Sequence, residues 1–244
     1  MEGVDPINIA ATLVAKRFPE ALAAFLGGSV LTAARTTTTD LDIVVIRPDG
    51  HDTFRETLRY REWPVELFVS TPTTYARFLH REIAARASPL LHMVGHGVIL
   101  ADSDGSAIRL RHDAAQRITQ GPDPATPQQI DDLRYRLSDL LDDLDGATDP
   151  DETIVIATAI FTAIAELVLT VGGYWLAGGK WLGRRLRTAD PDLHTALLDA
   201  FRGAAGGDPR SLRAVGYQVL DRVGGRLLEG YHRIAPPDIT GPPA

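Results

Sequence analysis

Three acidic residues in the first third of the sequence have a spacing that suits divalent-cation chemistry. Asp40 and Asp42 stand at the head of the apolar run at 41–46, and Glu66 interrupts a second apolar run at 64–69. In a β-strand, a spacing of two residues points both aspartates to one face. Carboxylates on one face repel each other unless a cation lies between them, and oxygen ligands of this kind suit magnesium. Asp40, Asp42 and Glu66 are therefore the predicted metal ligands and catalytic residues.

A glycine-serine turn precedes the paired aspartates. Gly27, Gly28 and Ser29 follow the short apolar run at 21–26. If a helix begins at this turn, its backbone N–H groups and the serine hydroxyl can face a phosphate group. These three residues are the predicted phosphate-binding residues. The three carboxylates nearby could form a site for two metal ions. In such a site one ion would lower the pKa of an attacking hydroxyl, and the other would neutralise a leaving pyrophosphate.

These motifs together resemble a known family. Gly28-Ser29, ten intervening residues and Asp40-Leu-Asp42 look like the signature of the nucleotidyltransferase superfamily related to DNA polymerase beta, and Glu66 fits its third acid. The resemblance to its compact bacterial members, the aminoglycoside and minimal nucleotidyltransferases, covers about residues 6–101. It implies that Ser29 binds the triphosphate, and that Glu66 binds a metal or acts as base on the acceptor hydroxyl. The sequence departs from the family pattern at 36–39, where a serine often precedes the first aspartate.

The resemblance implies a magnesium-dependent transfer of a nucleoside monophosphate to a hydroxyl group. The favoured version moves AMP from ATP to a small molecule, such as an aminoglycoside, and releases pyrophosphate. The expected cofactors are two Mg²⁺ ions, with ATP or another nucleoside triphosphate as co-substrate. Two alternatives stay open: an antitoxin-like enzyme that transfers AMP to a protein, and a catalytically silent regulator that binds nucleotide.

The first half of the chain predicts the domain that must position these residues. Residues 1–118 mix helical and strand patterns, which indicates an α+β domain with a mixed sheet flanked by helices. The resemblance identifies it as the catalytic domain. The predicted strands lie at 21–26, 41–46, 55–61, 65–70 and 97–101, and the predicted helices at 6–17, 73–86 and 106–118.

The second half predicts an all-helical domain. Three prolines and a glycine at 119–127 predict a linker, because proline cannot continue a helix. Residues 128–235 predict a bundle of four helices, at 128–144, 153–176, 193–201 and 211–231, and 236–244 predict a flexible tail. The apolar stretch at 153–179 is long enough to span a bilayer. Its single acid, Glu166, and its two glycine pairs favour a buried central helix over a membrane anchor.

Two features of the helical half could take part in chemistry. Lys180 and Arg184 belong to a cluster of four basic residues at 180–187, and we expect them to reach across an interdomain cleft to the triphosphate. The alternative is that this cluster balances a helix end or nearby aspartates. Glu166 is either a general base for the acceptor hydroxyl or the partner of a buried arginine or of Tyr174.

Composition narrows the remaining possibilities. The 244 residues contain no cysteine, which excludes disulfides, thiolate metal sites and cysteine nucleophiles, and favours the cytoplasm. The net charge of -7 argues against general nucleic-acid binding. We expect no signal peptide, because 1–6 lack a basic run before an apolar stretch. The sequence leaves the oligomeric state open, a homodimer included.

Overall fold

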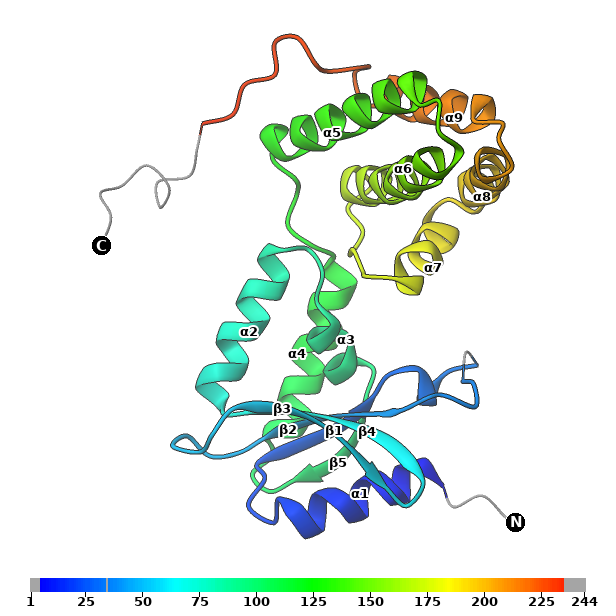
Figure 1. The fold of residues 1–244 in the computed structure, drawn as a ribbon. Helices are drawn as coiled ribbons and strands as arrows, with labels where there is room; N and C mark the ends of the chain where they lie inside the picture. Colours follow the sequence, from blue (N-terminus) through cyan, green and yellow to red (C-terminus); the bar gives the residue numbers. More distant parts are fainter. Residues whose placement is uncertain (1–4, 34, 235–244) are drawn as a thin grey trace, which may run out of the picture. The chain divides into compact units, whose positions relative to one another are not determined.

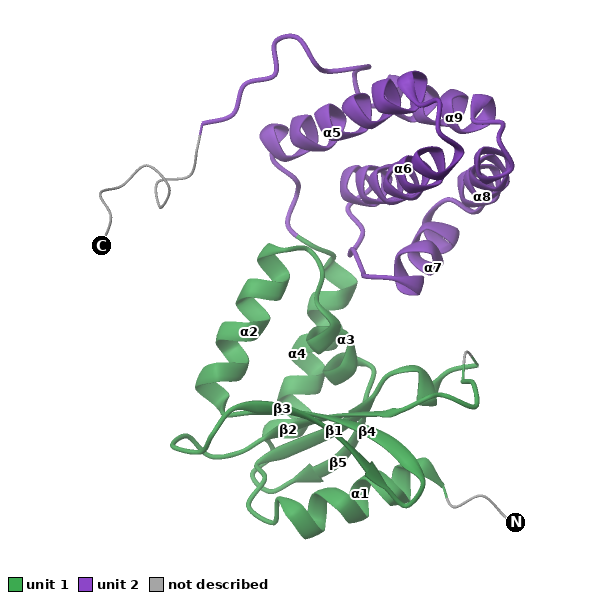
Figure 2. Cartoon of the chain, viewed as in Figure 1, with its two compact units in different colours: residues 1–122 green, residues 123–244 purple. Residues whose placement is uncertain are grey.

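The computed structural model describes residues 5–33 and 35–234. The chain divides into two compact units, residues 1–122 and 123–244, each described here by itself (Figure 2). The division between them falls within the predicted linker, whereas the predicted tail at 236–244 lies outside the described residues. The predicted α+β class is confirmed, because a mixed sheet in the first unit precedes a run of helices.

The first unit contains a five-stranded sheet with the order β3-β4-β2-β1-β5. The strands β2 and β4 are parallel, and the other neighbouring strands are antiparallel. The chain leaves β2, forms the outer strand β3 and returns as β4 between these two, which explains the one parallel pair. The strands are β1 (Ala23–Gly27), β2 (Leu41–Ile46), β3 (Phe54–Tyr60), β4 (Trp63–Ser70) and β5 (Val98–Asp102).

Helices cover both faces of this sheet (Figure 1). On one face, α1 (Pro6–Arg17) packs against a core that includes Leu26, Ile43 and Leu67. Asp5 starts α1 by accepting a hydrogen bond from the Ile7 N–H at 3.1 Å. The opposite face carries α3 (Pro89–Gly95) and α4 (Ser106–Gln120), and α2 (Pro72–Ala84) packs beside α3.

The sequence does not predict α3, which is a short helix. It has only seven residues and ends at Gly95, so its periodic pattern is too brief to recognise. Its start follows ordinary capping chemistry, because the Ser88 hydroxyl accepts a hydrogen bond from the Leu91 N–H at 3.2 Å. The buried residues Leu90, Leu91 and Val94 attach α3 to the unit.

The second unit contains five helices in its described part, where four were predicted. The additional helix, α7, buries only Leu182 and Leu186 and is otherwise rich in basic residues. The last helix ends at Asp221 and not near Tyr231, because Gly224 and Gly225 adopt positive φ angles of 102° and 81°. The helices are α5 (Pro127–Gly146), α6 (Pro150–Val171), α7 (Lys180–Ala189), α8 (Pro191–Ala205) and α9 (Arg210–Asp221).

The apolar helix α6 is the centre of the second core. Buried residues such as Ile160, Ile164 and Leu167 lie in a cluster shared with α5, α7, α8 and α9. The predicted burial of this central helix is incomplete towards both of its ends, where Val155 is 70% and Val171 is 46% exposed. Within the described ranges, α6 is the one helix long and apolar enough to cross a membrane by length and composition alone. Core helices of soluble proteins often share these two properties.

The packing of α6 can be tested by truncating one buried and one exposed side chain of this helix. Replacing Ile160, which is fully buried, with alanine leaves a cavity, and we expect the free energy of unfolding to fall by about 2–5 kcal/mol. Replacing the exposed Val155 with alanine should change it by less than about 0.5 kcal/mol. Denaturant titration of both variants measures the difference. Equal effects would contradict the core position of α6.

Candidate active site

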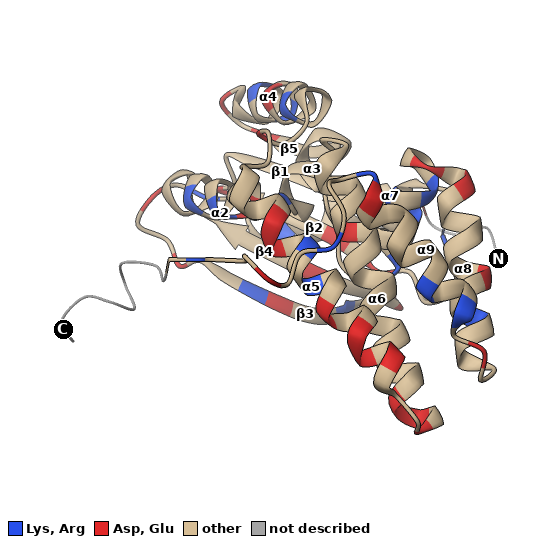
Figure 3. Cartoon of the chain, turned by 90° about the horizontal axis from the view of Figure 1, so that it is seen from above, with Lys and Arg blue, Asp and Glu red and all other residues tan. Residues whose placement is uncertain are grey.

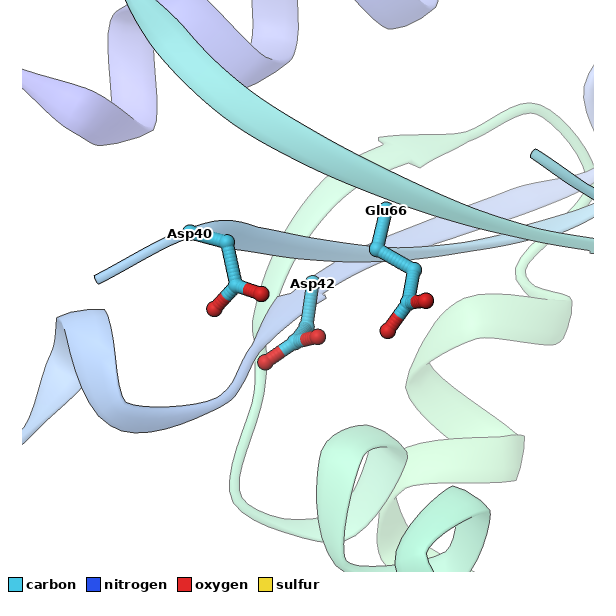
Figure 4. Close-up of side chains that lie close together, drawn as sticks. All are labelled: Asp40, Asp42 and Glu66. Carbon is cyan, nitrogen blue, oxygen red and sulfur yellow. The ribbon is translucent and has the colours of Figure 1, made fainter. Parts of the chain in front are cut away.

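The pairing of β2 with its two neighbours places the predicted residues side by side. Asp42 is aligned with Gly27 of β1 and with Glu66 of β4. Asp40 precedes Asp42 by two residues and points to the same side of the sheet, as Figure 4 shows. One carboxylate oxygen from each of the three acids lies within 4.8 Å of the others. The predicted convergence of Asp40, Asp42 and Glu66 is thus present in the structure.

This group of oxygens fits a hard divalent cation. All three residues are half-buried, and among the described residues they form the one group of this kind that could hold a metal ion. Three ionised carboxylates at this separation repel one another, and a cation between them relieves the repulsion. Magnesium prefers such oxygen ligands together with phosphate oxygens and water. Asp40, Asp42 and Glu66 are therefore the residues that would hold Mg²⁺.

Gly28 lies directly against one of these carboxylates. Its φ of 79° and ψ of -171° belong to a conformation that essentially only glycine adopts. A Cβ atom at this position would lie 1.9 Å from Oδ2 of Asp42, so any side chain would displace the carboxylate. Gly27 has a different neighbour, because its Cβ would lie 2.8 Å from Cβ of Met93 in α3. Gly28 thus makes room for Asp42, and Gly27 makes room for α3.

Ser29 begins a single turn of 3-10 helix, Ser29–Leu31, directly after Gly28. Its hydroxyl donates a long hydrogen bond of 3.5 Å to Oγ1 of Thr39. Thr39 is buried and also accepts a hydrogen bond from the Thr36 N–H at 2.8 Å. These bonds connect the turn at Ser29 to the residue before Asp40. Sequence reasoning missed this role of Thr39, because nothing in the run of four threonines distinguishes the buried one.

Arg55 is a second residue that sequence reasoning missed. Its Nε and Nη2 atoms both donate to Oε1 of Glu66, at 2.8 and 2.5 Å. Arg55 lies on β3, and its guanidinium carbon is 5.0 Å from the ring centre of Phe68 on β4. The available signal is the alternation along β3, which places Arg55 and Thr57 on one face, with Thr57 opposite Glu66. That signal identifies Arg55 only when the register of β3 against β4 is known.

The remaining predicted residues belong to the second unit. Glu166 on α6 accepts a hydrogen bond from Nη1 of Arg136 on α5 at 2.7 Å. That arginine is 47% exposed, whereas the expected partner was a buried arginine. Lys180 is exposed at the start of α7, and the guanidinium carbon of Arg184 lies 4.5 Å from the ring centre of Trp181. The roles of Glu166, Lys180 and Arg184 in catalysis or nucleotide binding stay predictions.

The contact between Gly28 and Asp42 predicts a selective effect of substitution. We expect Gly28→Ala to weaken Mn²⁺ binding by at least about tenfold, since the added methyl group must displace a ligand carboxylate. The matched control is Gly50→Ala. Gly50 also has a positive φ, of 95°, but nothing lies within 4 Å of its Cβ position. Isothermal titration with Mn²⁺ compares the two variants, and equal affinities would contradict the assigned role of Gly28.

Comparison with solved structures finds several matching chains, and the likeness to one of them is weak. The chain is similar to a solved nucleotidyltransferase-like protein from Exiguobacterium sibiricum 255-15, at 15% identity and a TM-score of 0.44. The match covers 89% of this chain and 79% of that chain. No family model and no curated protein matches the sequence. A likeness at this level carries no argument about activity, so the functional conclusion depends on the geometry of the site.

Proposed function

We propose that this chain is a magnesium-dependent nucleotidyltransferase. It would transfer a nucleoside monophosphate, AMP from ATP in the favoured version, to a hydroxyl group of a small molecule and release pyrophosphate. The observation that carries this proposal is the convergence of one carboxylate oxygen each from Asp40, Asp42 and Glu66 within 4.8 Å, with Gly28 directly against Asp42. A protein that binds nucleotide without a metal ion gains nothing from three converging carboxylates and suffers their repulsion.

The residues of the site have distinct tasks in this reaction. Bound Mg²⁺ would lower the pKa of the attacking hydroxyl and neutralise charge on the leaving pyrophosphate. Asp40, Asp42 and Glu66 would hold the cations, and Gly28 leaves the space that the Asp42 carboxylate occupies. Ser29 would bind the triphosphate, its hydroxyl exchanging the long 3.5 Å hydrogen bond to Thr39 for one to a phosphate oxygen.

The transfer requires one bond to form, one to break and one proton to leave. The acceptor oxygen attacks the α-phosphorus, and the bond from that phosphorus to the pyrophosphate oxygen breaks. A base takes the proton of the acceptor hydroxyl. Glu66 and Glu166 are the candidates for this base. Both accept hydrogen bonds from an arginine in the structure, so arginine pairing does not distinguish them, whereas Glu66 has the advantage of lying beside the two aspartates.

The acidic helix α5 gives little support to an aminoglycoside acceptor. A polycationic drug would need acidic side chains that are available for binding, and Figure 3 shows acidic residues along this helix. Most of them are engaged in ion pairs with arginines of the same unit. The pairs are Asp131 with Arg134, Asp132 with Arg233, Asp142 with Arg226 and Asp145 with Arg213. The small-molecule acceptor is therefore proposed without a more specific class.

The proposed activity can be tested with labelled ATP, Mg²⁺ and a panel of hydroxyl compounds that includes aminoglycosides. We expect the label to move to an acceptor, and Asp42→Asn to lower the rate by at least about a hundredfold, because it removes the negative charge of a direct metal ligand. Asp52→Asn is the matched control. This exposed aspartate lies in the same unit outside the group of three acids, and its loss should leave the rate unchanged.

Other outcomes of this experiment would change the assignment. Label on a protein partner in place of a small molecule would favour the antitoxin-like enzyme. Bound ATP without any transfer would favour the silent regulator. Equal rates for Asp42→Asn and Asp52→Asn would contradict a reaction that depends on the three carboxylates.

We further propose that Lys180 and Arg184 bind the triphosphate. Support comes from the four basic residues of α7, in a unit whose other helices carry many acids. We expect Lys180→Ala to weaken ATP binding roughly tenfold, the value of one charge-assisted hydrogen bond. Arg187→Ala, at an exposed position in the last turn of α7, serves as the control. Unchanged ATP affinity in Lys180→Ala, measured by calorimetry, would refute this role.

A further inference from the structure

We propose that Arg55 is a displaceable counter-ion of Glu66. Arg55 forms an ion pair with the Glu66 carboxylate when no divalent cation is bound, and this ion pair lowers the cation affinity of the free protein. This inference rests on the proposed metal site, and it gives Arg55 the role of a positioning residue that acts through Glu66. The supporting observations are the contact between the two side chains, their different exposure and the balance of charge around them.

The contact places Arg55 in competition with a cation for the same carboxylate. Both donor atoms of Arg55, Nε and Nη2, contact the single oxygen Oε1 of Glu66. Glu66 also offers an oxygen within 4.8 Å of oxygens of Asp40 and Asp42. The same carboxylate therefore belongs both to the ion pair with Arg55 and to the predicted cation site.

The arginine can leave this contact at little cost. The side chain of Arg55 is 66% exposed, whereas that of Glu66 is 19% exposed. Ion pairs with a solvated partner stabilise proteins only weakly, because water replaces much of the interaction. The guanidinium group also lies 5.0 Å from the ring centre of Phe68, a contact that does not depend on Glu66. When a cation binds Glu66, Arg55 thus keeps its contact with Phe68, which lies on the same strand as Glu66.

The charge balance gives the direction of the effect. The three carboxylates carry three negative charges when ionised, and the adjacent guanidinium reduces the net charge of the group to two. A positive charge beside Glu66 repels a divalent cation that approaches alone. A nucleoside triphosphate brings several negative charges of its own, which offset this repulsion. Arg55 therefore favours a cation that arrives with the nucleotide over a cation that arrives alone.

The experiment measures Mn²⁺ affinity of the full-length chain without nucleotide, by electron paramagnetic resonance. We expect Arg55→Met, which removes the charge but keeps an apolar side chain beside Phe68, to bind Mn²⁺ about three- to tenfold more tightly than the original protein. Arg55→Gln should show the same tightening. Arg55→Lys keeps the charge and should stay within about twofold of the original affinity.

Arg59→Met is the matched control for this series. Arg59 lies on the same face of β3 and is also exposed, but it donates to the backbone oxygen of Glu62 at 3.0 Å. We expect its substitution to leave Mn²⁺ affinity unchanged. A merely structural role of Arg55 would lower the unfolding temperature without tightening Mn²⁺ binding, so thermal unfolding is measured on every variant.

The possible results separate this inference from the proposed function. Unchanged or weaker Mn²⁺ binding in both Arg55→Met and Arg55→Gln would overturn the role of Arg55 as a competing counter-ion. If that result accompanies a loss of binding in Asp42→Asn, the metal site stands and only the inference fails. If the original protein and Asp42→Asn bind Mn²⁺ equally, or neither binds it, the metal site fails and the inference falls with it.

Discussion

The first unit must hold three mutually repelling carboxylates close together on one sheet. Asp42 and Glu66 are held next to each other by the parallel pairing of β2 with β4. Asp40 lies beside them because it precedes Asp42 by two residues and points to the same side of the sheet. Acids in such positions would separate if their backbones were free to move. The sheet prevents this, because both strands are interior to it and their apolar neighbours are buried on one face beneath α1.

The backbone around the acids is equally constrained. Gly28 adopts a conformation that other residues avoid, and the missing side chain leaves the space that Oδ2 of Asp42 occupies. The buried hydroxyl of Thr39 joins the loop before Asp40 to the turn at Ser29. The site thus keeps its acids close together in the absence of a cation, with Arg55 on Glu66 offsetting part of their repulsion.

Much of this site follows from local sequence patterns, and the rest depends on pairing between distant segments. The alternation at 64–69 and the position of Asp40 and Asp42 before an apolar run are local, so the three acids and the strands β2 and β4 could be predicted. The contact of Arg55 with Glu66 could not, because it requires the register of β3 against β4. The helix α3 was missed for another reason, since its seven residues are too few to produce a clear periodicity. The helix α7 has the helical spacing of its two buried residues, Leu182 and Leu186, which the sequence prediction did not use.

The outer strand β3 has a consequence for the behaviour of the protein in solution. An edge strand presents unpaired backbone groups that can add a strand from another molecule. The exposed side chains of β3 include Arg55 and Arg59. If a strand from another molecule paired with β3, it would lie beside these two charged side chains and restrict them. The arginine that touches Glu66 thus also belongs to a charged border that protects the sheet against edge-to-edge aggregation.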